Sequence, residues 1–238
     1  MHPYKMKPSE ADLKIALYKA DSVQGKVPST TCSNRGECCR AGCPNMYYCE
    51  YVRMAEHVAE LPLERRAVII EESLRRYLKP QVVDDPKPCL FLSETIIDGV
   101  ITGSRCDVYE VRPLKCRLYG LIPEEMYKRN VASVAREMEV EKERVPLCVQ
   151  CDQVRGRVMA ESEIAAMEKD LRQADLVLGM PKSVQDDGFG FLTFHDWHLM
   201  TQLGEEWLEG LSALRLRCSD DEKEQFVAAL KAELASCL

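Results

Sequence analysis

The chain has 238 residues, of which 46% are hydrophobic and 30% are charged, a balance typical of globular proteins. Its net charge of −7 argues against a nucleic-acid partner, and no apolar run approaches the ~20 residues that a membrane-spanning helix needs. Charges and prolines occupy the first residues, where a signal peptide would have an apolar core. The sequence therefore predicts a cytoplasmic protein with no membrane partner.

Apolar residues recur at helical spacing through most of the chain, which predicts a mainly α-helical single domain. The helices are expected at residues 9–20, 49–60, 62–79, 123 to about 146, 152–178, 195–215 and 220–236. Ser9 and Asp12 form a capping-box pattern at the start of the first helix. In the helix over 62–79, the expected buried stripe consists of Leu63, Ala67, Ile70, Leu74 and Tyr77.

One region has the character of β-structure. Two apolar runs within residues 89–102 flank Asp98-Gly99, a dipeptide typical of tight hairpin turns. An isolated two-stranded hairpin is only marginally stable, so we expect it to lean on helices or on a metal site.

Cysteines are the most informative residues of the chain. There are twelve, and ten of them lie between residues 32 and 151, where five occur within eighteen positions. The ten are Cys32, Cys38, Cys39, Cys43, Cys49, Cys89, Cys106, Cys116, Cys148 and Cys151. Thiols gather in this way to close disulfides or to hold metal, because a buried structural cysteine has no reason to cluster.

Metal ligation is the favoured interpretation, with six disulfides as the alternative. A reducing cytosol disfavours disulfides, and the neighbours Cys38 and Cys39 cannot easily bridge to each other. Cys148 and Cys151 have the C-x2-C spacing that lets two thiolates bind one centre. We therefore expect residues 32–151 to form a metal-binding core around one or two centres of four thiolates each, with residues 152–238 as a helical cover.

Three segments carry a resemblance to a known family. They are Cys32 with Cys38-Cys39, then Pro88-Cys89-Leu90-Phe91-Leu92, then the run from Cys106 through Tyr109-Glu110 and Arg112-Pro113 to Cys116-Arg117. In this order they resemble the CxxCxxCC, or YkgJ-like, cysteine-cluster family over about half of the chain. The resemblance implies a zinc- or iron-chelating protein and leaves the identity of the metal open.

Thiolate-only ligation suits both zinc and iron–sulfur centres. Because only one clean C-x2-C pair exists and the other thiols are scattered among apolar residues, an iron–sulfur (4Fe-4S) cluster is favoured, for electron transfer or cluster-dependent catalysis. A zinc-stabilised binding module without catalytic activity is the alternative. The sequence identifies neither a catalytic residue nor the protein or small molecule that would be its partner.

Other residues near the cysteines have two interpretations each. Arg112 and Arg117 could bind the cofactor or an anionic substrate, or could form salt bridges with Glu110 or a neighbouring helix. His195 and His198 are expected to have a capping or surface role. Cys218 and Cys237, isolated in C-terminal helices, are expected to be free thiols.

Overall fold

The computed structural model describes residues 8–30, 37–40, 42–79, 87–137, 141–142, 156–180, 192–202 and 204–237. The protein is mainly helical, with 64% of residues in helices and 9% in strands, which confirms the predicted mainly α class with a small hairpin. Its helices are α1 (Glu10–Gly25), α2 (Glu37–Arg40), α3 (Tyr48–Ala59), α4 (Leu63–Leu78), α5 (Leu114–Arg117), α6 (Glu124–Glu137), α7 (Glu161–Val177), α9 (Phe194–Gln202), α10 (Gly204–Arg217) and α11 (Asp220–Cys237). A short 3-10 helix, η2 (Tyr109–Val111), and the strands β1 (Leu92–Ile97) and β2 (Val100–Cys106) complete the described elements.

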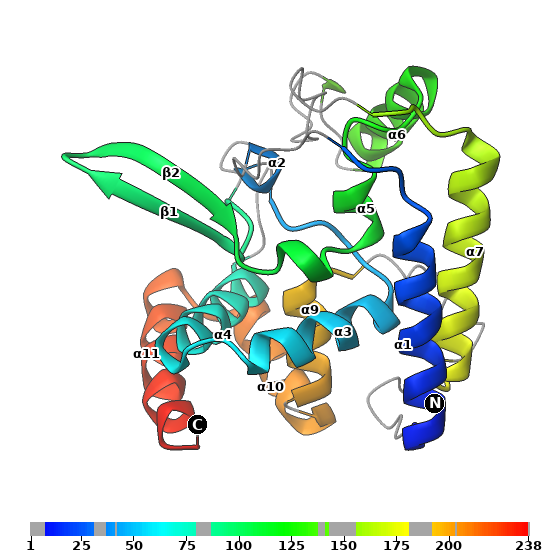
Figure 1. The fold of residues 1–238 in the computed structure, drawn as a ribbon. Coiled ribbons are helices and arrows are strands. Elements are labelled where there is room, and N and C mark those ends of the chain that lie inside the picture. The colour runs from blue at the N-terminus through cyan, green and yellow to red at the C-terminus, as the bar shows by residue number, and fades with distance from the viewer. Residues whose placement is uncertain are drawn as a thin grey trace.

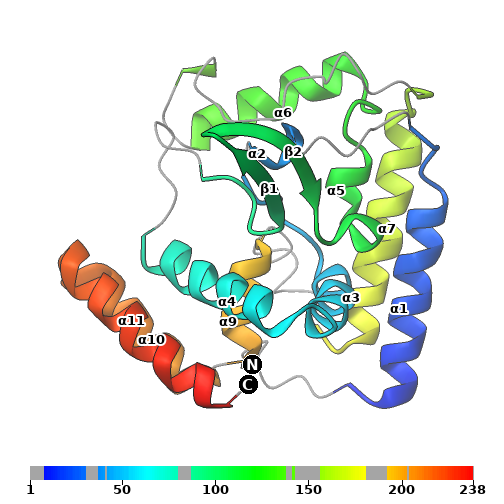
Figure 2. The same cartoon turned by 60° about the vertical axis from the view of Figure 1, so that its left-hand side comes forward.

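Helix α3 lies at the centre of the helical arrangement. It contacts α1, α7 and α9, while α1 and α7 lie side by side along one flank of the molecule (Figures 1 and 2). Helix α4 contacts α9, α10 and α11 on the other flank. The C-terminal helices therefore contribute to the same buried core as the cysteine-containing segments, and do not only cover it.

Aromatic side chains form the middle of this core. The rings of Tyr48 and Trp197 have centroids 5.1 Å apart, and those of Phe91 and Phe194 are 4.8 Å apart in an edge-to-face arrangement. The buried indole of Trp197 donates from Nε1 to the carbonyl of Met46 (3.1 Å), so its polar atom is satisfied. These contacts join α3 and α9 to the segments that carry Cys43 and Cys89.

A buried carboxylate joins α7 to the start of α3. Asp175 accepts hydrogen bonds from the backbone N–H groups of Tyr48 (3.1 Å) and Cys49 (2.8 Å), which are unpaired donors at the helix N-terminus. Burial raises the pKa of Asp175 to about 6, while the bonds from Cys49 partly oppose that shift.

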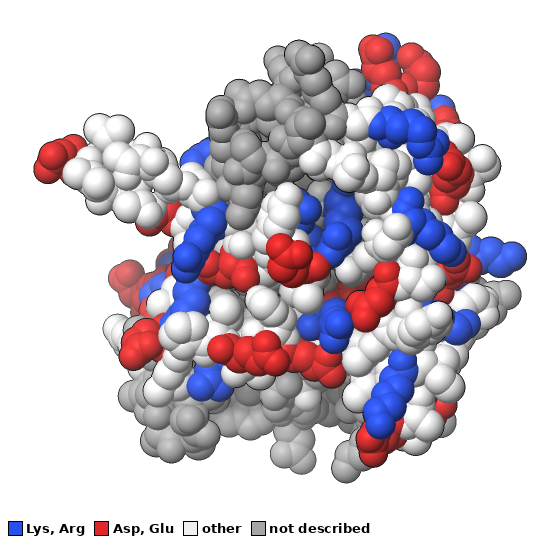
Figure 3. Space-filling view, in the orientation of Figure 1, with Lys and Arg blue, Asp and Glu red and all other residues white. Residues whose placement is uncertain are grey.

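The hairpin projects from the body as an arm (Figure 1). Its turn is formed by Asp98 (φ 50°) and Gly99 (φ 77°), which confirms the predicted turn dipeptide. Ile96 pairs with Ile101 and Ile97 with Val100, and these four side chains are between 47% and 62% exposed. In the space-filling view the arm is largely uncharged except at its ends (Figure 3).

The base of the hairpin, by contrast, is tied to the body. Arg40 of α2 donates to Glu94 (2.7 Å) and to Ser104 (2.8 Å), and Ser93 donates to both oxygens of Asp107 (2.8 Å each). The strands flank Asp98-Gly99 as predicted, but the β region covers residues 92–106 and not 89–102. It starts later because residues 89–91 form a turn closed by the Leu92 N–H on the Cys89 carbonyl (3.1 Å). The hairpin thus starts just after Cys89 and ends on Cys106.

Most helix predictions agree with the structure to within a residue at their starts, but the buried face of α4 differs from the prediction. Its buried residues are Ile69, Ser73, Leu74 and Leu78, whereas Leu63 is 47% exposed. The difference arises because α4 packs on α9, α10 and α11, and because its arginines reach toward the cysteine loops. The hydroxyl of Ser73 donates to the Ile69 carbonyl (2.8 Å), which removes the cost of its burial.

Three helix boundaries also differ. Helix α1 continues to Gly25, five residues beyond the expected end. Helix α7 starts at Glu161 because residues 156–160 are non-helical: Met159 N–H donates to the Leu121 carbonyl (2.8 Å), and Glu163 caps Ala160 N–H (2.8 Å). The expected helix over 195–215 is two helices, α9 and α10, with Gly204 opening the second.

None of the helices in the described part of the chain combines the length and apolarity that crossing a bilayer requires.

Candidate functional site

Five cysteines from five separate segments line one cavity. Cys39 lies on α2, Cys43 in the loop that follows it, Cys89 before β1, Cys106 at the end of β2, and Cys116 on α5. The rest of the wall is formed by Pro44, Met46, Met54, Phe91, Val108, Tyr109, Arg112 and Pro113. Apart from Arg112, these side chains offer no charge, so the cavity is a mostly apolar space with thiols around it.

Cys39, Cys43 and Cys89 form the tightest part of the wall. The Sγ atoms of Cys43 and Cys89 are 3.5 Å apart, and the thiol of Cys89 also bonds to that of Cys39. The backbone N–H of Cys89 donates to the Cys39 carbonyl (2.5 Å), which fixes the two segments to each other. None of the three is in a disulfide.

Cys43 lies among groups that favour a negatively charged sulfur. The Leu90 N–H donates to its Sγ (3.2 Å), and Nη1 of Arg76 lies 3.8 Å from it. The pKa of Cys43 is well below its ordinary value because hydrogen bonds from Cys89 and His195 and the charge of Arg76 outweigh burial.

Cys89 responds in the opposite way. A hydrogen bond with Cys39 lowers its pKa, but the bond with Cys43 and burial outweigh it, so the pKa lies well above the ordinary value. The two neighbouring thiols therefore have pKa values shifted in opposite directions, that of Cys43 down and that of Cys89 up.

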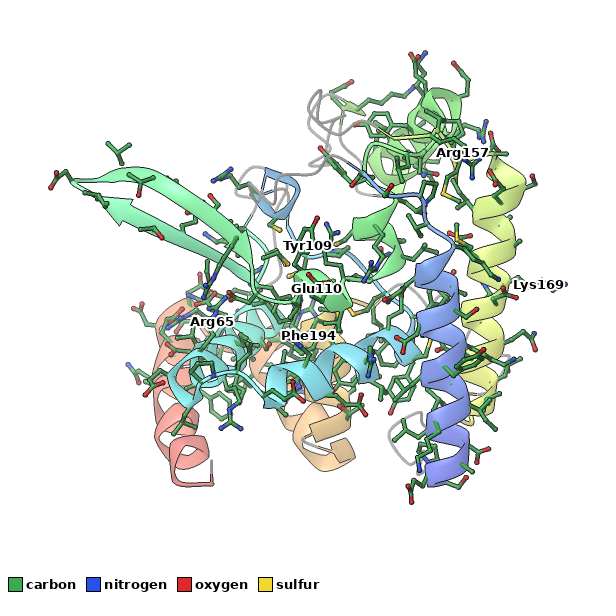
Figure 4. All side chains as sticks on the ribbon, viewed as in Figure 1. Arg65, Tyr109, Glu110, Arg157, Lys169 and Phe194 are labelled. Carbon is green, nitrogen blue, oxygen red and sulfur yellow. The ribbon has the colours of Figure 1, made fainter. Side chains whose placement is uncertain are left out.

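Arg65 of α4 connects the loops that carry Cys89 and Cys106. Its Nη2 donates to the Leu90 carbonyl (2.5 Å) and its Nε donates to Asp107 (2.6 Å), whose side chain is 4% exposed. Figure 4 places Arg65 between α4 and the base of the hairpin. Because Leu90 follows Cys89 and Asp107 follows Cys106, this one side chain fixes the spacing of two cavity walls.

Two further side chains position the cysteine-bearing segments. Arg76, one turn from the end of α4, donates from Nη2 to the Pro88 carbonyl next to Cys89. Glu50 of α3 accepts from the N–H of Leu114 (2.6 Å) and from that of Tyr47 (3.1 Å), and so holds the start of α5, which carries Cys116. Burial raises the pKa of Glu50 to about 7 despite these two bonds.

Arg112 directly follows η2, and Arg117 is the last residue of α5. The guanidinium carbon of Arg112 lies 3.6 Å from the ring centroid of Tyr109, and its Nε donates to the Tyr109 carbonyl (2.9 Å). Arg117 donates from Nε to the Arg112 carbonyl (3.0 Å) and from Nη2 to the Glu110 carbonyl. Neither arginine forms a salt bridge with a carboxylate of the described residues, so the sequence-based salt-bridge alternative is not what the structure has.

Cys49 lies apart from the cavity. It is completely buried at the start of α3, where its thiol donates to the Leu171 carbonyl (3.7 Å). Burial, together with the nearby Asp175, raises its pKa well above the ordinary value, as expected for a protonated structural thiol. Of the other expected ligands, Cys32, Cys148 and Cys151 lie outside the described residues, as does the side chain of Cys38.

The two histidines lie against the interior, in contrast to the expected capping or surface role. His195 bonds through Nδ1 to the Thr193 hydroxyl (2.8 Å), and its imidazole also bonds to Cys43. His198 stacks on Phe194, and burial lowers its pKa to about 4. Cys218 is a half-buried free thiol, as predicted, while the side chain of Cys237 lies outside the described residues.

Sequence analysis missed three residues that position the cysteines, Glu50, Arg65 and Arg76, and gave His195 a different role. The contacts of the three join residues 12 to 64 positions apart, so no local pattern marks them. Arg76 also lies near Glu72, one turn earlier in α4, at an Nε–carboxylate distance of 3.8 Å.

Among the described residues, no group of three or more His, Cys, Asp or Glu side chains is arranged so that it could hold one metal ion. Comparison with known proteins found no matching family model, no similar curated protein and no similar solved structure.

Proposed function

We propose that the cysteine cavity holds a thiolate-ligated metal centre, with an iron–sulfur (4Fe-4S) cluster as the first candidate. When bound, such a cluster would supply electron transfer or cluster-dependent catalysis. The observation that carries the proposal is the convergence of Cys39, Cys43, Cys89, Cys106 and Cys116 on one apolar cavity without a disulfide among them. The ligands of the centre would be drawn from these five and from Cys32, Cys38, Cys148 and Cys151.

The chemistry of the wall suits such a group. Thiolates select soft metals and clusters, and the cavity lining contains no carboxylate that would favour a hard cation. The donors at Cys43, namely Leu90 N–H and Arg76, are of the kind that stabilise anionic sulfur around a bound centre. Similarity to the CxxCxxCC family is part of this proposal and rests on the three motifs alone.

The dispersed arrangement of the thiols favours a cluster over a single ion. A cluster presents several irons to its ligands, whereas one ion needs all its ligands within one tetrahedron. Ten clustered cysteines in the sequence also exceed the four that one zinc ion would use.

A zinc-stabilised binding module is the second candidate, and one distance favours it. Tetrahedral zinc with Zn–S bonds of ~2.3 Å places its sulfurs about 3.8 Å apart. The Cys43–Cys89 separation of 3.5 Å is close to that value. In this case the metal would stabilise the fold and supply no redox chemistry.

Metal and acid-labile sulfide analysis, with a visible spectrum, tests the proposal on protein purified without air. We expect iron and sulfide in equal amounts, a brown colour, and loss of both in Cys43→Ser and Cys89→Ser. Cys218→Ser is the matched control, because this thiol lies outside the cavity, and it should retain the metal. Zinc without sulfide would select the second candidate, and protein that binds neither metal would contradict both.

A further inference from the structure

Arg112 is a cation without a counter-ion at the wall of the cysteine cavity. Its guanidinium lies on the ring of Tyr109, and its Nε donates to the Tyr109 carbonyl. Within the described residues, neither Nη atom has a hydrogen-bond acceptor and no carboxylate is paired with it. Two arginines of α4, in contrast, are paired with carboxylates: Arg65 with Asp107, and Arg75 with Glu71, Glu72 and Glu224.

A second arginine, Arg117, lies next to Arg112. Arg117 lies close enough to interact electrostatically with Arg112, and its own donors go to the backbone carbonyls of Arg112 and Glu110. The Glu110 carboxylate forms no ion pair with either arginine. Burial and the charge of Arg112 lower the pKa of Arg117, while the charges of Glu110 and Glu50 act in the opposite direction. Figure 4 shows Tyr109 and Glu110 on the short helix at the centre of the molecule, between α4 and α5.

Arg112 is also the one cationic side chain among the described residues that line the cavity. A guanidinium presents its Nη donors as a planar fork that matches two oxygens of a carboxylate or a phosphate. Stacking on Tyr109 and the bond from Nε fix the plane of this fork. The apolar walls beside it strengthen its attraction for an anion, because they exclude water that would screen the charge.

We propose that Arg112 binds an oxyanion, the carboxylate or phosphate of a small molecule, at the wall of the cysteine cavity. This molecule would be the substrate or effector of the metal centre, so its role rests on the function proposed above. The anion itself would bind through the fork of Arg112, with Arg117 adding charge behind it. The thiols, on the same cavity wall, would lie beside the molecule that the anion anchors.

Isothermal titration calorimetry with two probes, malonate and inorganic phosphate, tests this assignment on the full chain at low ionic strength. We expect one of the two to bind in a saturable, one-to-one manner, which identifies carboxylate or phosphate as the ligand chemistry. Arg112→Gln should weaken that binding at least about tenfold, the effect of losing one charge-assisted pair of hydrogen bonds. Arg112→Lys, which keeps the charge but not the fork, should have intermediate affinity.

Arg129→Gln is the matched control, because Arg129 is an exposed arginine on α6 paired with Glu161. This variant should bind the anion with the same affinity as the unchanged protein. Equal affinities in Arg112→Gln and the unchanged protein would overturn the assignment, as would the absence of saturable binding of both anions. Loss of metal from Arg112→Gln with unchanged anion affinity would also overturn it, since Arg112 would then serve the centre alone.

Metal content, measured on the same samples, separates this inference from the proposed function. A protein that binds the anion through Arg112 but holds no metal would refute the metal centre and leave the anion site standing. A protein that holds metal but binds neither anion would refute the anion site and leave the metal centre standing.

Discussion

Replacing Arg65 with alanine removes the contact that joins the Cys89 and Cys106 loops. The change deletes the ion pair with Asp107, at 2.6 Å, and the bond to the Leu90 carbonyl, at 2.5 Å. A hydrogen bond to a charged group contributes about 1.5–3 kcal/mol, and one to a neutral carbonyl about 1 kcal/mol. Asp107 keeps the two bonds from Ser93, so its buried carboxylate is not left unpaired. We therefore expect a loss of roughly 2–4 kcal/mol in the free energy of unfolding.

Urea unfolding at neutral pH measures this loss, and Arg129→Ala is its control. The Arg129–Glu161 pair is more than half exposed on both sides, and such surface pairs contribute about 0–1 kcal/mol. Arg65→Lys should recover part of the stability through the ion pair alone, because an ammonium group lacks the fork that reaches both acceptors. An Arg65→Ala variant no less stable than Arg129→Ala would refute the role given to Arg65.

The remaining predictions concern buried carboxylates and one close approach of the backbone. Folding raises the pKa of Glu50 from 4.5 to about 7 and that of Asp175 from 3.8 to about 6, so the folded state holds protons that the unfolded state releases. Stability should therefore fall as pH rises from about 4 to 7, by roughly 3 kcal/mol per group, and Glu50→Gln or Asp175→Asn should flatten that dependence in urea titrations at several pH values. A steeper dependence in either variant would contradict this sign. Gly156→Ala should lower the free energy of unfolding by about 1–3 kcal/mol in the same assay, because the added Cβ would lie 2.7 Å from Leu121 Cδ2. An unchanged urea midpoint would contradict this prediction.

Local signals were sufficient to predict most of the secondary structure. The Ser9–Asp12 cap is present at the start of α1, where Ser9 Oγ accepts from Asp12 N–H (3.1 Å), and the Asp98-Gly99 turn has the positive φ angles that its residues favour. Helix α4 begins one residue after the expected position, with Pro62 as its N-cap at a non-helical ψ of 143°. Signals of this kind depend on a few neighbouring residues, so they do not depend on which helices pack together in the fold.

The buried face of α4 and the start of α7 are set by tertiary contacts, which the periodicity of apolar residues does not reveal. Helix α4 has apolar residues on more than one face, and the choice of Ile69 and Leu78 as the buried ones depends on which helices pack beside it. Residues 156–160 were expected to be helical, but they are not, and the Met159 N–H donates instead to the carbonyl of the distant Leu121. Neither outcome is encoded within the segment itself.

The candidate site divides in the same way. Clustering in the sequence was enough to select the cysteines, and the structure brings five of the predicted ones together around a cavity while leaving Cys49 elsewhere. The positions of Arg65 and Glu50 could not be predicted, since each acts on a loop that is distant in sequence. Charged residues such as these are common on helix surfaces, and only the folded structure shows which acceptor or donor each one contacts.

X-ray absorption at the iron and zinc edges, on protein purified without air, tests the central claim most directly. The account predicts a bound metal whose first shell consists of sulfur, with an iron–iron vector if the centre is a cluster. A protein without a bound transition metal, or one whose metal has only nitrogen and oxygen neighbours, would contradict it.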